Sequence, residues 1–378
     1  MRSVITVSLM SVVFVSCAST PRLEKGTETK RCIVGYLFEG DSIVDPNSLH
    51  LGMVTDLLYA FANIRGDTIV PGFKNDTENL RILDEAKREY PNLKILISVG
   101  GWEWSGAFSD MCLTSESRAK FIEGAVRFVQ KNNLDGIDID WEYPGLPGAG
   151  NVHRPEDKQN FTTLLAGLRM ALDNLGMKTG KHYLVTIAAG AFGDYLEHTD
   201  MAEDSKYLDF INLMTYDMSV PGGDSLAGNN APLFTNPRDP HLNSDNRAVE
   251  EFEAAGVPPS KIVLGVPFYG HAWQVDSTAF NGLYEPGRPT VSPINATYAN
   301  LVDNYINKNG YIRYWDSTSC VPYLFNEADS ILISYDDPQS LLDKCEYIKA
   351  RELRGVMFWS FNSDYRSTLL RTLYDELK

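Results

Sequence analysis

The sequence predicts an α/β fold, a (β/α)8 TIM barrel with a small α+β insertion domain between strand 7 and helix 7. Three observations lead to this prediction. Short apolar runs alternate with helical patterns, as they do in a barrel of parallel strands. A segment of different composition, residues 271–332, interrupts the pattern after the seventh run. The chain of 378 residues exceeds the roughly 250 residues of a simple barrel, and this segment accounts for most of the excess.

Each expected strand is a short apolar run bounded by polar or turn-forming residues. The runs are 33–37, 56–62, 94–99, 136–142, 183–189, 210–215, 262–268 and 355–361. The expected helices repeat apolar residues three or four positions apart, as Leu80, Leu83 and Ala86 do. These helices are 77–89, 116–131, 155–175, 247–255, 338–351 and 364–377.

The interrupting segment, 271–332, is rich in Gly, Pro, Asn and Tyr and contains one expected helix, 295–308. Regular barrel connections have only a few residues, so a segment of this length indicates an inserted domain. It leaves the barrel at the end where such folds carry their active sites. Its aromatics Trp273, Tyr284 and Tyr298 either fill its own core, which is the favoured interpretation, or face a groove. A second long loop, 222–245, is expected over the same rim.

The N-terminal residues 1–17 read as a signal peptide, with a basic start, a short apolar core and small residues at a cleavage point. Phe14-Val15-Ser16-Cys17 resembles a bacterial lipobox, which predicts lipidation of Cys17; the alternative is an ordinary secretory signal cut nearby. Residues 18–30 read as a tether, and 31–378 as the catalytic barrel interrupted by the insertion. Either interpretation predicts export, to the cell envelope or outer surface as a lipoprotein, or otherwise into the medium.

Charge and composition exclude several partners. A formal net charge of −16 disfavours nucleic acid and anionic membrane surfaces, so membrane contact is expected only through the lipid anchor. A neutral ligand, no cofactor and a monomer are expected. No metal is expected either, since the six histidines show no metal-ligand spacing. Beyond Cys17, four cysteines remain, and they allow three disulfide pairings between which the sequence does not choose: Cys32, Cys112, Cys320 and Cys345.

The most informative segment is the acidic run at residues 135–142. Side chains alternate faces along a strand, so Asp138, Asp140 and Glu142 share one face, spaced roughly 6 to 7 Å apart along it. Carboxylates this close raise one another's pKa and share protons. A solvated edge strand is the alternative, but strands in an α/β pattern are normally buried, and buried charge indicates function. Asp135 is out of step and is expected to tie the start of the strand.

Further polar and aromatic residues end the other strands, at the edge where barrel enzymes carry their chemistry. They are Tyr36, Ser98-Val99-Gly100-Gly101-Trp102, Met214-Thr215-Tyr216-Asp217, Tyr269 and Trp359. Together with the Asp-x-x-Asp-x-Asp-x-Glu spacing, this set resembles the family 18 glycoside hydrolases, the chitinases, over essentially the whole mature chain. The insertion and the following Ser334-Tyr335-Asp336-Asp337 look like the insertion domain of the deep-cleft subgroup. His271 departs from that subgroup, which often has Arg there, and this puts its substrate contact in doubt.

The resemblance implies a chitinase that cleaves β-1,4-linked N-acetylglucosamine polymers or oligosaccharides with retention. Family 18 is a substrate-assisted exception among retaining glycosidases. Glu142 would then be the general acid, with its pKa raised by neighbouring Asp140. Asp140 would stabilise an oxazolinium formed by the substrate's own acetamido group, Asp138 would share a proton, and Tyr216 would bond the acetamido oxygen. In the resemblance Trp359 is the floor under the distorted sugar. Cleft lining, with rim packing as the alternative, is implied for Tyr36, Trp102, Met214, Asp217 and Tyr269.

Other functions remain open from the sequence. A relative that cleaves peptidoglycan or the N-glycan core is the nearest alternative, although glycan trimmers usually lack the insertion. A chitin-binding lectin without activity usually lacks the acid, whereas Glu142 and Asp140 are both present. An unrelated barrel enzyme that uses phosphate or a metal is disfavoured, because the sequence has no phosphate loop at strands 7 and 8 and no ligand cluster.

Overall fold

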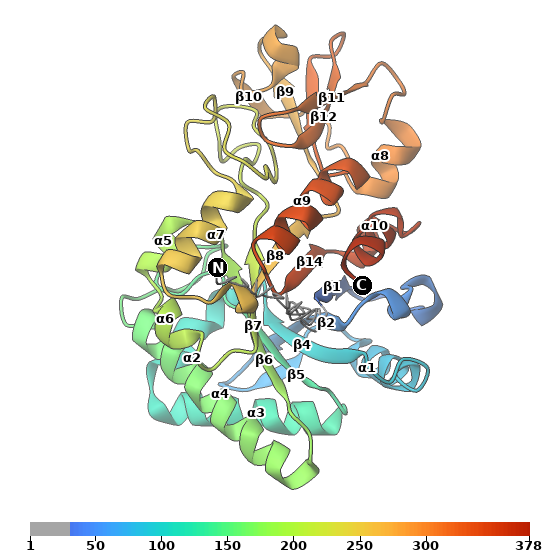
Figure 1. Ribbon diagram of the computed structural model, residues 1–378. Helices are drawn as coiled ribbons and strands as arrows, with labels where there is room; N and C mark the ends of the chain where they lie inside the picture. The colour runs from blue at the N-terminus through green and yellow to red at the C-terminus, as the bar shows by residue number, and fades with distance from the viewer. Residues whose placement is uncertain (1–30) are drawn as a thin grey trace, which may run out of the picture. The chain divides into compact units, whose positions relative to one another are not determined.

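The computed structural model describes residues 31–378 (Figure 1). Within that range eight parallel strands close into a barrel in the order β1-β14-β8-β7-β6-β5-β4-β2, and β1 pairs with β2 to complete the circle. A short strand, β3 (Ile69–Pro71), adds antiparallel to β2. The barrel strands are β1 (Cys32–Phe38), β2 (Asp56–Ile64), β4 (Lys94–Gly100), β5 (Gly136–Asp140), β6 (Leu184–Gly190), β7 (Phe210–Met214), β8 (Ile262–Pro267) and β14 (Gly355–Trp359). The predicted barrel is confirmed.

Helices surround the strands (Figure 1). They are α1 (Asp76–Ala86), α2 (Phe108–Leu113), α3 (Ser115–Lys131), α4 (Asp157–Thr179), α5 (Gly193–Glu197), α6 (Met201–Asp204), α7 (Asp245–Ala254), α9 (Pro338–Ala350) and α10 (Thr368–Leu377). Local chemistry sets their starts. Thr114 and Ser117 form a reciprocal capping box for α3, and Asp337 caps α9 with Pro338 in its first turn.

The ring of helices is less regular than a simple repeat predicts. Between β1 and β2 the chain makes only the 3-10 turns η1 (Pro46–Ser48) and η2 (Leu51–Met53). Between β6 and β7 it makes only the short helices α5 and α6. Further 3-10 turns are η3 (Ser105–Ala107), η4 (Pro259–Lys261) and η6 (Phe361–Ser363). The β1–β2 connection contains two glycines and a proline and has no helical apolar repeat, which explains the absence of a helix there.

Strand alternation separates two cores. Residues such as Ile137, Ile139 and Trp141 point outward into the large core beneath the helices. The alternate residues point inward and form a second, smaller core inside the barrel, which includes Val34, Tyr36, Leu58, Leu96, Phe210, Val263 and Met357. The inward face of β5 instead presents Asp138 and Asp140, which are 0% and 4% exposed. The acidic strand is therefore buried on both faces, and the edge-strand alternative is wrong.

The insertion folds as its own antiparallel sheet in the order β10-β9-β13-β12-β11. Its elements are β9 (His271–Val275), η5 (Ala279–Gly282), β10 (Gly287–Pro289), α8 (Tyr298–Asn304), β11 (Ile312–Asp316), β12 (Val321–Asn326) and β13 (Ile331–Ser334). The helix is shorter than the predicted 295–308, and the sheet ends at Ser334 rather than at residue 332. Trp273 and Tyr284 are buried in the sheet's own core, as the favoured interpretation predicts. Tyr298 is also buried, but it packs into the large core shared with the barrel instead of the insertion's own core.

The described cysteines form no disulfide. Cys32, Cys112 and Cys345 are buried thiols, and Cys320 is a partly exposed one, so none of the three possible pairings occurs among them. No helix within residues 31–378 is long and apolar enough to cross a bilayer. The predicted signal peptide, the predicted tether and Cys17 lie outside the described residues.

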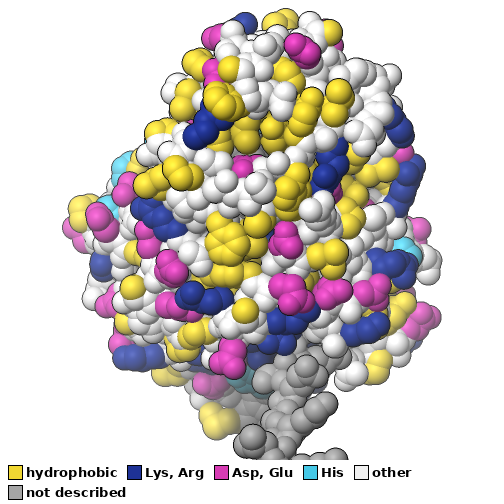
Figure 2. All heavy atoms as spheres, turned by 45° about the horizontal axis from the view of Figure 1, so that its top comes forward, with side chains coloured by type: hydrophobic (Ala, Val, Ile, Leu, Met, Phe, Trp, Pro, Cys, Tyr) yellow, Lys and Arg dark blue, Asp and Glu magenta, His cyan; other side chains and the backbone are white. Residues whose placement is uncertain are grey.

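The surface has mixed charge despite the acidic total. On the face shown in Figure 2, Lys and Arg side chains are interspersed with Asp and Glu, and exposed hydrophobic side chains gather over the middle and upper parts. Many of these charges form ion pairs between neighbouring helical turns, such as Arg81 with Glu78 and Glu85 on α1. Such exposed pairs contribute little to stability, typically about 0 to 1 kcal/mol each.

Candidate active site

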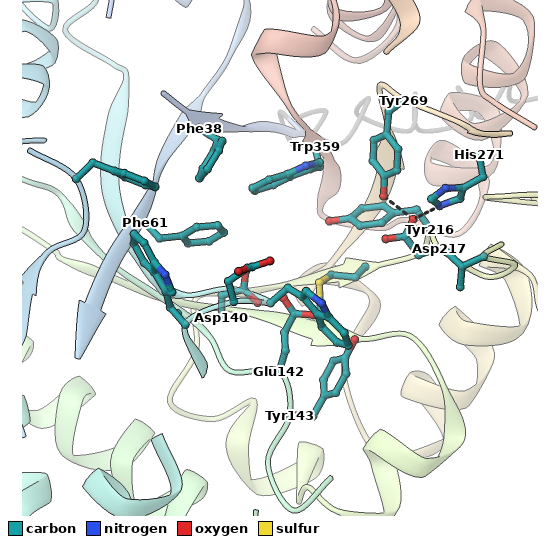
Figure 3. A pocket seen from close by; sticks show the side chains of 17 residues that line it. Phe38, Phe61, Asp140, Glu142, Tyr143, Tyr216, Asp217, Tyr269, His271 and Trp359 are labelled. Atoms are coloured by element: carbon teal, nitrogen blue, oxygen red, sulfur yellow. Dashed lines mark hydrogen bonds and ion pairs between the residues drawn. The ribbon is translucent and has the colours of Figure 1, made fainter. Parts of the chain in front are cut away.

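A cleft of about 900 Å³ opens at the carboxyl ends of the barrel strands (Figure 3). Its lining comes from most of the barrel strands and their following loops: Phe38, Phe61, Phe73, Gly100, Trp102, Glu103, Trp104, Asp140, Glu142, Tyr143, Met214, Tyr216, Asp217, Val220, Tyr269, His271 and Trp359. Eight of the ten predicted catalytic and cleft-lining residues are part of this lining, and the two exceptions are Asp138 and Tyr36. Among described residues the insertion itself contributes only His271 to this lining.

Asp138 lies below the cleft and is completely buried. Its carboxylate accepts hydrogen bonds from four neighbouring strands: from the Tyr36 hydroxyl at 2.8 Å, Ser98 Oγ at 2.7 Å, Thr186 Oγ1 at 2.6 Å and Asn212 Nδ2 at 3.4 Å. Burial raises the pKa of Asp138, and these four donors oppose the rise. The donors hold the carboxylate in one place at the centre of the barrel.

Tyr36 corrects one prediction. The sequence places it in the cleft lining, but the structure places it underneath, 1% exposed, with its hydroxyl donating to Asp138. The reason is its position within β1 rather than at its end, since the strand continues to Phe38. Phe38 is the residue of this strand that reaches the cleft.

Asp140 is the next inward carboxyl along β5 and is almost fully buried. Its Oδ1 has no hydrogen-bond partner among residues 31–378. Burial raises the pKa of Asp140 well above its ordinary range, and the charges of Glu142 and Asp138 raise it further. Asp140 is thus favoured in its protonated form, or next to a positive charge supplied by a ligand.

Glu142 lies just past the end of β5 and is 8% exposed. The predicted strand 136–142 ends at Asp140, because the backbone of Glu142 bonds to side chains instead of to a neighbouring strand. Its N–H donates to Ser105 Oγ at 2.8 Å, and its carbonyl accepts from Asn151 Nδ2 at 3.3 Å. The side chain points into the cleft beside Asp140 (Figure 3).

The pKa of Glu142 is raised to about 7. Burial is the largest cause, the neighbouring Tyr143 hydroxyl opposes it, and the carboxylate of Asp217 raises it further. The sequence attributes this rise to Asp140, whereas the structure attributes it mainly to burial. A carboxylic acid with a pKa near neutrality is suited to donate a proton and take it back.

The pair Gly100-Gly101 explains how the end of β4 packs against the end of β5, which carries Asp140. Gly100 has φ +107°, and a Cβ there would lie 2.3 Å from the carbonyl oxygen of Asp140. Gly101 donates its N–H to that same oxygen at 2.8 Å. The two glycines therefore let the end of β4 approach the end of β5 closely, as only glycine permits. The Ser-x-Gly-Gly run thus has a structural reason beside the acidic strand.

The opposite wall holds a bonded trio. Asp217 follows β7, and its Oδ1 accepts from the Tyr269 hydroxyl at 2.7 Å and lies 2.7 Å from His271 Nε2 (Figure 3). Tyr216 lies beside them with its ring centroid 6.2 Å from that of Tyr269. His271, which departs from the subgroup pattern, is therefore partnered by Asp217 and lines the cleft.

Aromatic rings form the remaining wall. Trp359, at the end of β14, stacks on Phe61 with centroids 5.6 Å apart and planes 17° apart. Phe38 and Phe73 extend this wall by edge contacts. Trp102 stands on the rim, 52% exposed. The sequence identified Trp359 and Trp102 but missed Phe38, Phe61 and Phe73; a Phe at the carboxyl end of β1 or β2 was the available signal.

The cleft continues past Glu142. A second pocket of about 300 Å³ shares with the first Glu142, Tyr143, Met214, Tyr216 and Asp217. Beyond these it is lined by the loop before α7, through Met218, Asp224, His241 and Asn243, and by residues after β6. Glu142 therefore lies between two connected spaces, one mainly aromatic and one more polar. Such an arrangement accommodates a chain that passes the acid on both sides.

The raised pKa of Glu142 predicts the alkaline limb of the pH profile. Glu142, the expected general acid, must be protonated in the free enzyme. We therefore expect kcat/KM to fall as pH rises through about 7. The measurement is kcat/KM between pH 4 and 9 on a soluble chromogenic glycoside. A limb that lies near the ordinary glutamate pKa of about 4.3 would show that the buried environment does not act on the acid.

Comparison with known proteins finds similar sequences and structures. Residues 32–364 match the family model described as glycosyl hydrolases family 18. The chain is 44% identical over 312 residues to Chitinase A1 of Niallia circulans, covering 79% of this chain and 44% of that protein. It is 31% identical to Chitinase 1 of Aphanocladium album, covering 85% of this chain and 78% of that protein. A solved family 18 N-acetylglucosaminidase from Paenibacillus barengoltzii is 41% identical with a TM-score of 0.85, covering 92% of this chain and 100% of that chain.

Proposed function

The chain belongs to glycosyl hydrolases family 18, and on that basis we propose that this glycoside hydrolase is a chitinase acting on β-1,4-linked N-acetylglucosamine polymers or oligosaccharides. The observation that carries the proposal is Glu142, a buried acid with a pKa raised to about 7 that lines two adjoining pockets. The chain spans 44% of the length of Chitinase A1.

The proposed function is tested with a ladder of chito-oligosaccharides of two to six sugars, followed by mass analysis of the products. Cleavage at internal bonds is expected, since the cleft extends on both sides of Glu142. Release of single sugars alone would instead indicate action at chain ends. No cleavage of any member would refute the proposal.

We further propose that cleavage is assisted by the substrate and retains the anomeric configuration. Glu142 donates its proton to the glycosidic oxygen, and the C–O bond breaks as the acetamido oxygen bonds to the anomeric carbon. Asp140, which its burial favours in the protonated form, would pass its proton to Asp138 deeper in the barrel, and the Asp140 carboxylate would then stabilise the resulting oxazolinium. Glu142, now ionised, removes a proton from water. The water oxygen bonds to the anomeric carbon, the bond from that carbon to the acetamido oxygen breaks, and the acetamide is restored.

The burial of Asp140 and its high pKa support this route. A carboxyl that resists ionisation is a poor nucleophile, but it becomes an effective partner once a cation forms beside it. The aromatic ring of Trp359 provides an apolar surface on which a sugar ring can stack. Tyr216 lines the cleft beside Tyr269, and this position supports the proposal that its hydroxyl bonds the acetamido oxygen.

The substrate-assisted route predicts a strict requirement for the acetamido group. Fully deacetylated chitosan should not be cleaved, because it lacks the attacking oxygen, and a thiazoline analogue of the cyclic intermediate should inhibit. The measurements are product release from chitin and chitosan oligosaccharides of equal length, and the inhibition constant of the analogue. A glycosyl ester trapped on an aspartate would contradict the route.

Export and lipid anchoring are proposed from residues 1–17, where Cys17 is the anchoring candidate. Replacing Cys17 by Ser should release the protein from the membrane fraction and leave turnover of soluble substrate unchanged. Fractionation of cells that express either form, with activity assays on each fraction, measures this. A variant that still pellets with membranes would place the anchor elsewhere.

A further inference from the structure

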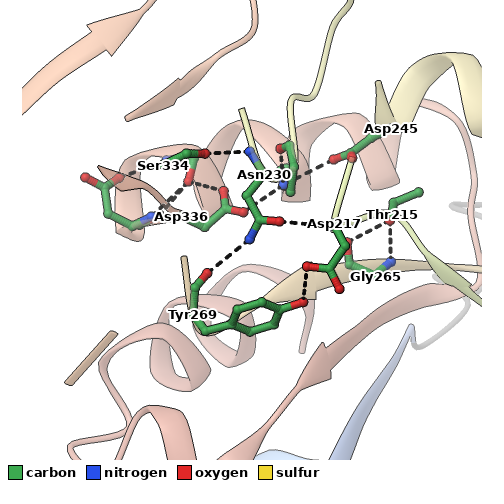
Figure 4. Close-up of polar contacts among 12 residues, drawn as sticks. Thr215, Asp217, Asn230, Asp245, Gly265, Tyr269, Ser334 and Asp336 are labelled. Carbon is green, nitrogen blue, oxygen red and sulfur yellow. Dashed lines mark hydrogen bonds and ion pairs between the residues drawn. The ribbon is translucent and has the colours of Figure 1, made fainter. Parts of the chain in front are cut away.

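Asn230 connects two segments of the same cleft wall although, among the described residues, it is not part of the lining. It belongs to the loop between β7 and α7, and it is 1% exposed. Its Oδ1 accepts the backbone N–H of Asp217 at 2.8 Å, and its Nδ2 donates to the carbonyl of Tyr269 at 3.2 Å (Figure 4). One side chain thus holds the backbones of two cleft residues that follow different strands.

The backbone around Asn230 is itself tied to the scaffold. Its N–H donates to Ser334 Oγ at the end of β13, and its carbonyl accepts from Met218 N at 3.0 Å. The next carbonyl, that of Ala231, accepts from Lys344 Nζ at 2.8 Å. Lys344 lies on α9 and is completely buried. Asn230 is therefore fixed from both sides before it reaches the cleft residues.

Asp217 needs such a hold because its backbone is strained. Its φ is +57°, in the left-handed region that residues other than glycine rarely occupy. The bond from its N–H to Asn230 stabilises this conformation. The conformation in turn directs the Asp217 carboxylate to Tyr269 and His271.

From this geometry we infer that Asn230 is a positioning residue for the hydrolytic reaction: it sets Asp217 and Tyr269 in register with Glu142 without touching the substrate. The inference rests on the proposed function. Asn230, in the segment Asn229-Asn230-Ala231, thereby gains a role in catalysis that the sequence patterns do not indicate.

Asn230 would affect the reaction through Asp217. Its charge contributes to the raised pKa of Glu142, whose other titratable neighbours are Asp140 and Tyr143. On the far side Asp217 faces Tyr216, Tyr269 and His271. Loss of the Asn230 bond should let Asp217 relax away from Glu142, so the pKa of Glu142 should fall. The alkaline limb of kcat/KM should then move to lower pH.

Adjacent Asn229 provides a matched control. It is 2% exposed, and its Nδ2 donates to Tyr284 Oη at 3.1 Å and Asp316 Oδ2 at 2.9 Å, both outside the cleft. Asn229→Ala and Asn230→Ala therefore each remove two buried hydrogen bonds from the same loop. A purely structural role would make the two variants behave alike.

The experiment compares kcat, KM and the pH profile of wild type, Asn229→Ala and Asn230→Ala on a soluble chromogenic chito-oligosaccharide. For Asn230→Ala we expect kcat to fall roughly 10- to 100-fold, with a smaller change in KM and the alkaline limb moved to lower pH. Asn229→Ala should retain the wild-type limb. Asn230→Asp, which keeps an acceptor for the Asp217 N–H but turns a buried carboxyl oxygen toward the Tyr269 carbonyl, should lower kcat at least as far as Asn230→Ala.

Two results would overturn the inference. One is a folded Asn230→Ala or Asn230→Asp whose kcat and alkaline limb match those of Asn229→Ala. The other is failure of both Asn230 variants to fold while Asn229→Ala folds, which would make Asn230 a structural residue. Inactivity of the wild type on this substrate would instead refute the proposed function, so the two failures are distinguishable.

Discussion

Glu142→Gln should lower kcat by about 10² to 10⁴ on substrates with poor leaving groups, because the amide has the shape of the acid but no proton to donate. The backbone of Glu142 is held by Ser105 and Asn151, so the substitution should leave its position unchanged. The measurement is kcat on unmodified chito-oligosaccharides. Exposed Glu123 on α3 supplies the matched control, Glu123→Gln, which should keep full activity.

The same variant should be more stable than the wild type at alkaline pH. The folded-state pKa of Glu142, about 7, exceeds the unfolded value of about 4.3, so ionisation of Glu142 costs stability as pH rises above 4. Gln avoids this cost, so Glu142→Gln should gain roughly 1 to 3 kcal/mol at pH 8 and little at pH 4. Retained activity would move the general acid elsewhere, and lost stability at pH 8 would show that Glu142 is not held in a desolvating site.

Much of the barrel could be predicted from the sequence. Each strand is a short apolar run, and its length and its place between helical patterns identify it. The ends of those runs also identified the cleft, since parallel strands bring their carboxyl ends together. Asp135 behaved as predicted: its carboxylate accepts from Ile95 N at 2.9 Å and pairs with Lys87. These features depend on local pattern and on the alternation of strand side chains.

The features that were missed depend on contacts between segments distant in sequence. Strand pairing stops at Asp140 because Ser105 takes the backbone of Glu142, and no pattern in 136–142 shows that. Phe61 lines the cleft because it stacks on Trp359, nearly three hundred positions away. Asn230 lies in a polar loop that reads as a surface connection until the fold brings Tyr269 beside it.

The second large effect is expected at Lys344, on the side of α9 that faces the loop before α7. Its Nζ lies 3.0 Å from Asp336 Oδ2 and 3.2 Å from Asp245 Oδ2, and all three side chains are buried (Figure 4). Burial raises the pKa of Asp245 to about 8 and also raises that of Asp336, while Lys344 opposes both shifts. The two aspartates raise the pKa of Lys344 despite its burial. The cluster is therefore held together by a single cation.

Lys344→Met should destabilise the protein by roughly 3 to 5 kcal/mol at pH 8, because it leaves two buried carboxyls without a cation. The loss should shrink toward pH 5. The folded-state pKa values of both aspartates are raised, and they rise further without Lys344, so at low pH both carboxyls are neutral and need no counter-charge. Equilibrium denaturation at pH 5 and pH 8 measures the difference.

Lys349→Met, on the same helix, is the matched control. Lys349 pairs with Glu346 and Glu376 but is 31% exposed, so water can replace its contacts and the substitution should cost about 1 kcal/mol or less. Equal losses for the two variants at pH 8 would mean that the buried cluster adds no more than a surface pair. A loss at Lys344 that does not change with pH would mean that lost packing, not unpaired charge, causes it. Lys344 also donates to the carbonyl of Ala231, the residue that follows Asn230. A loss of stability caused by unpaired charge would therefore mean that the cation that stabilises α9 also holds the loop that carries Asn230.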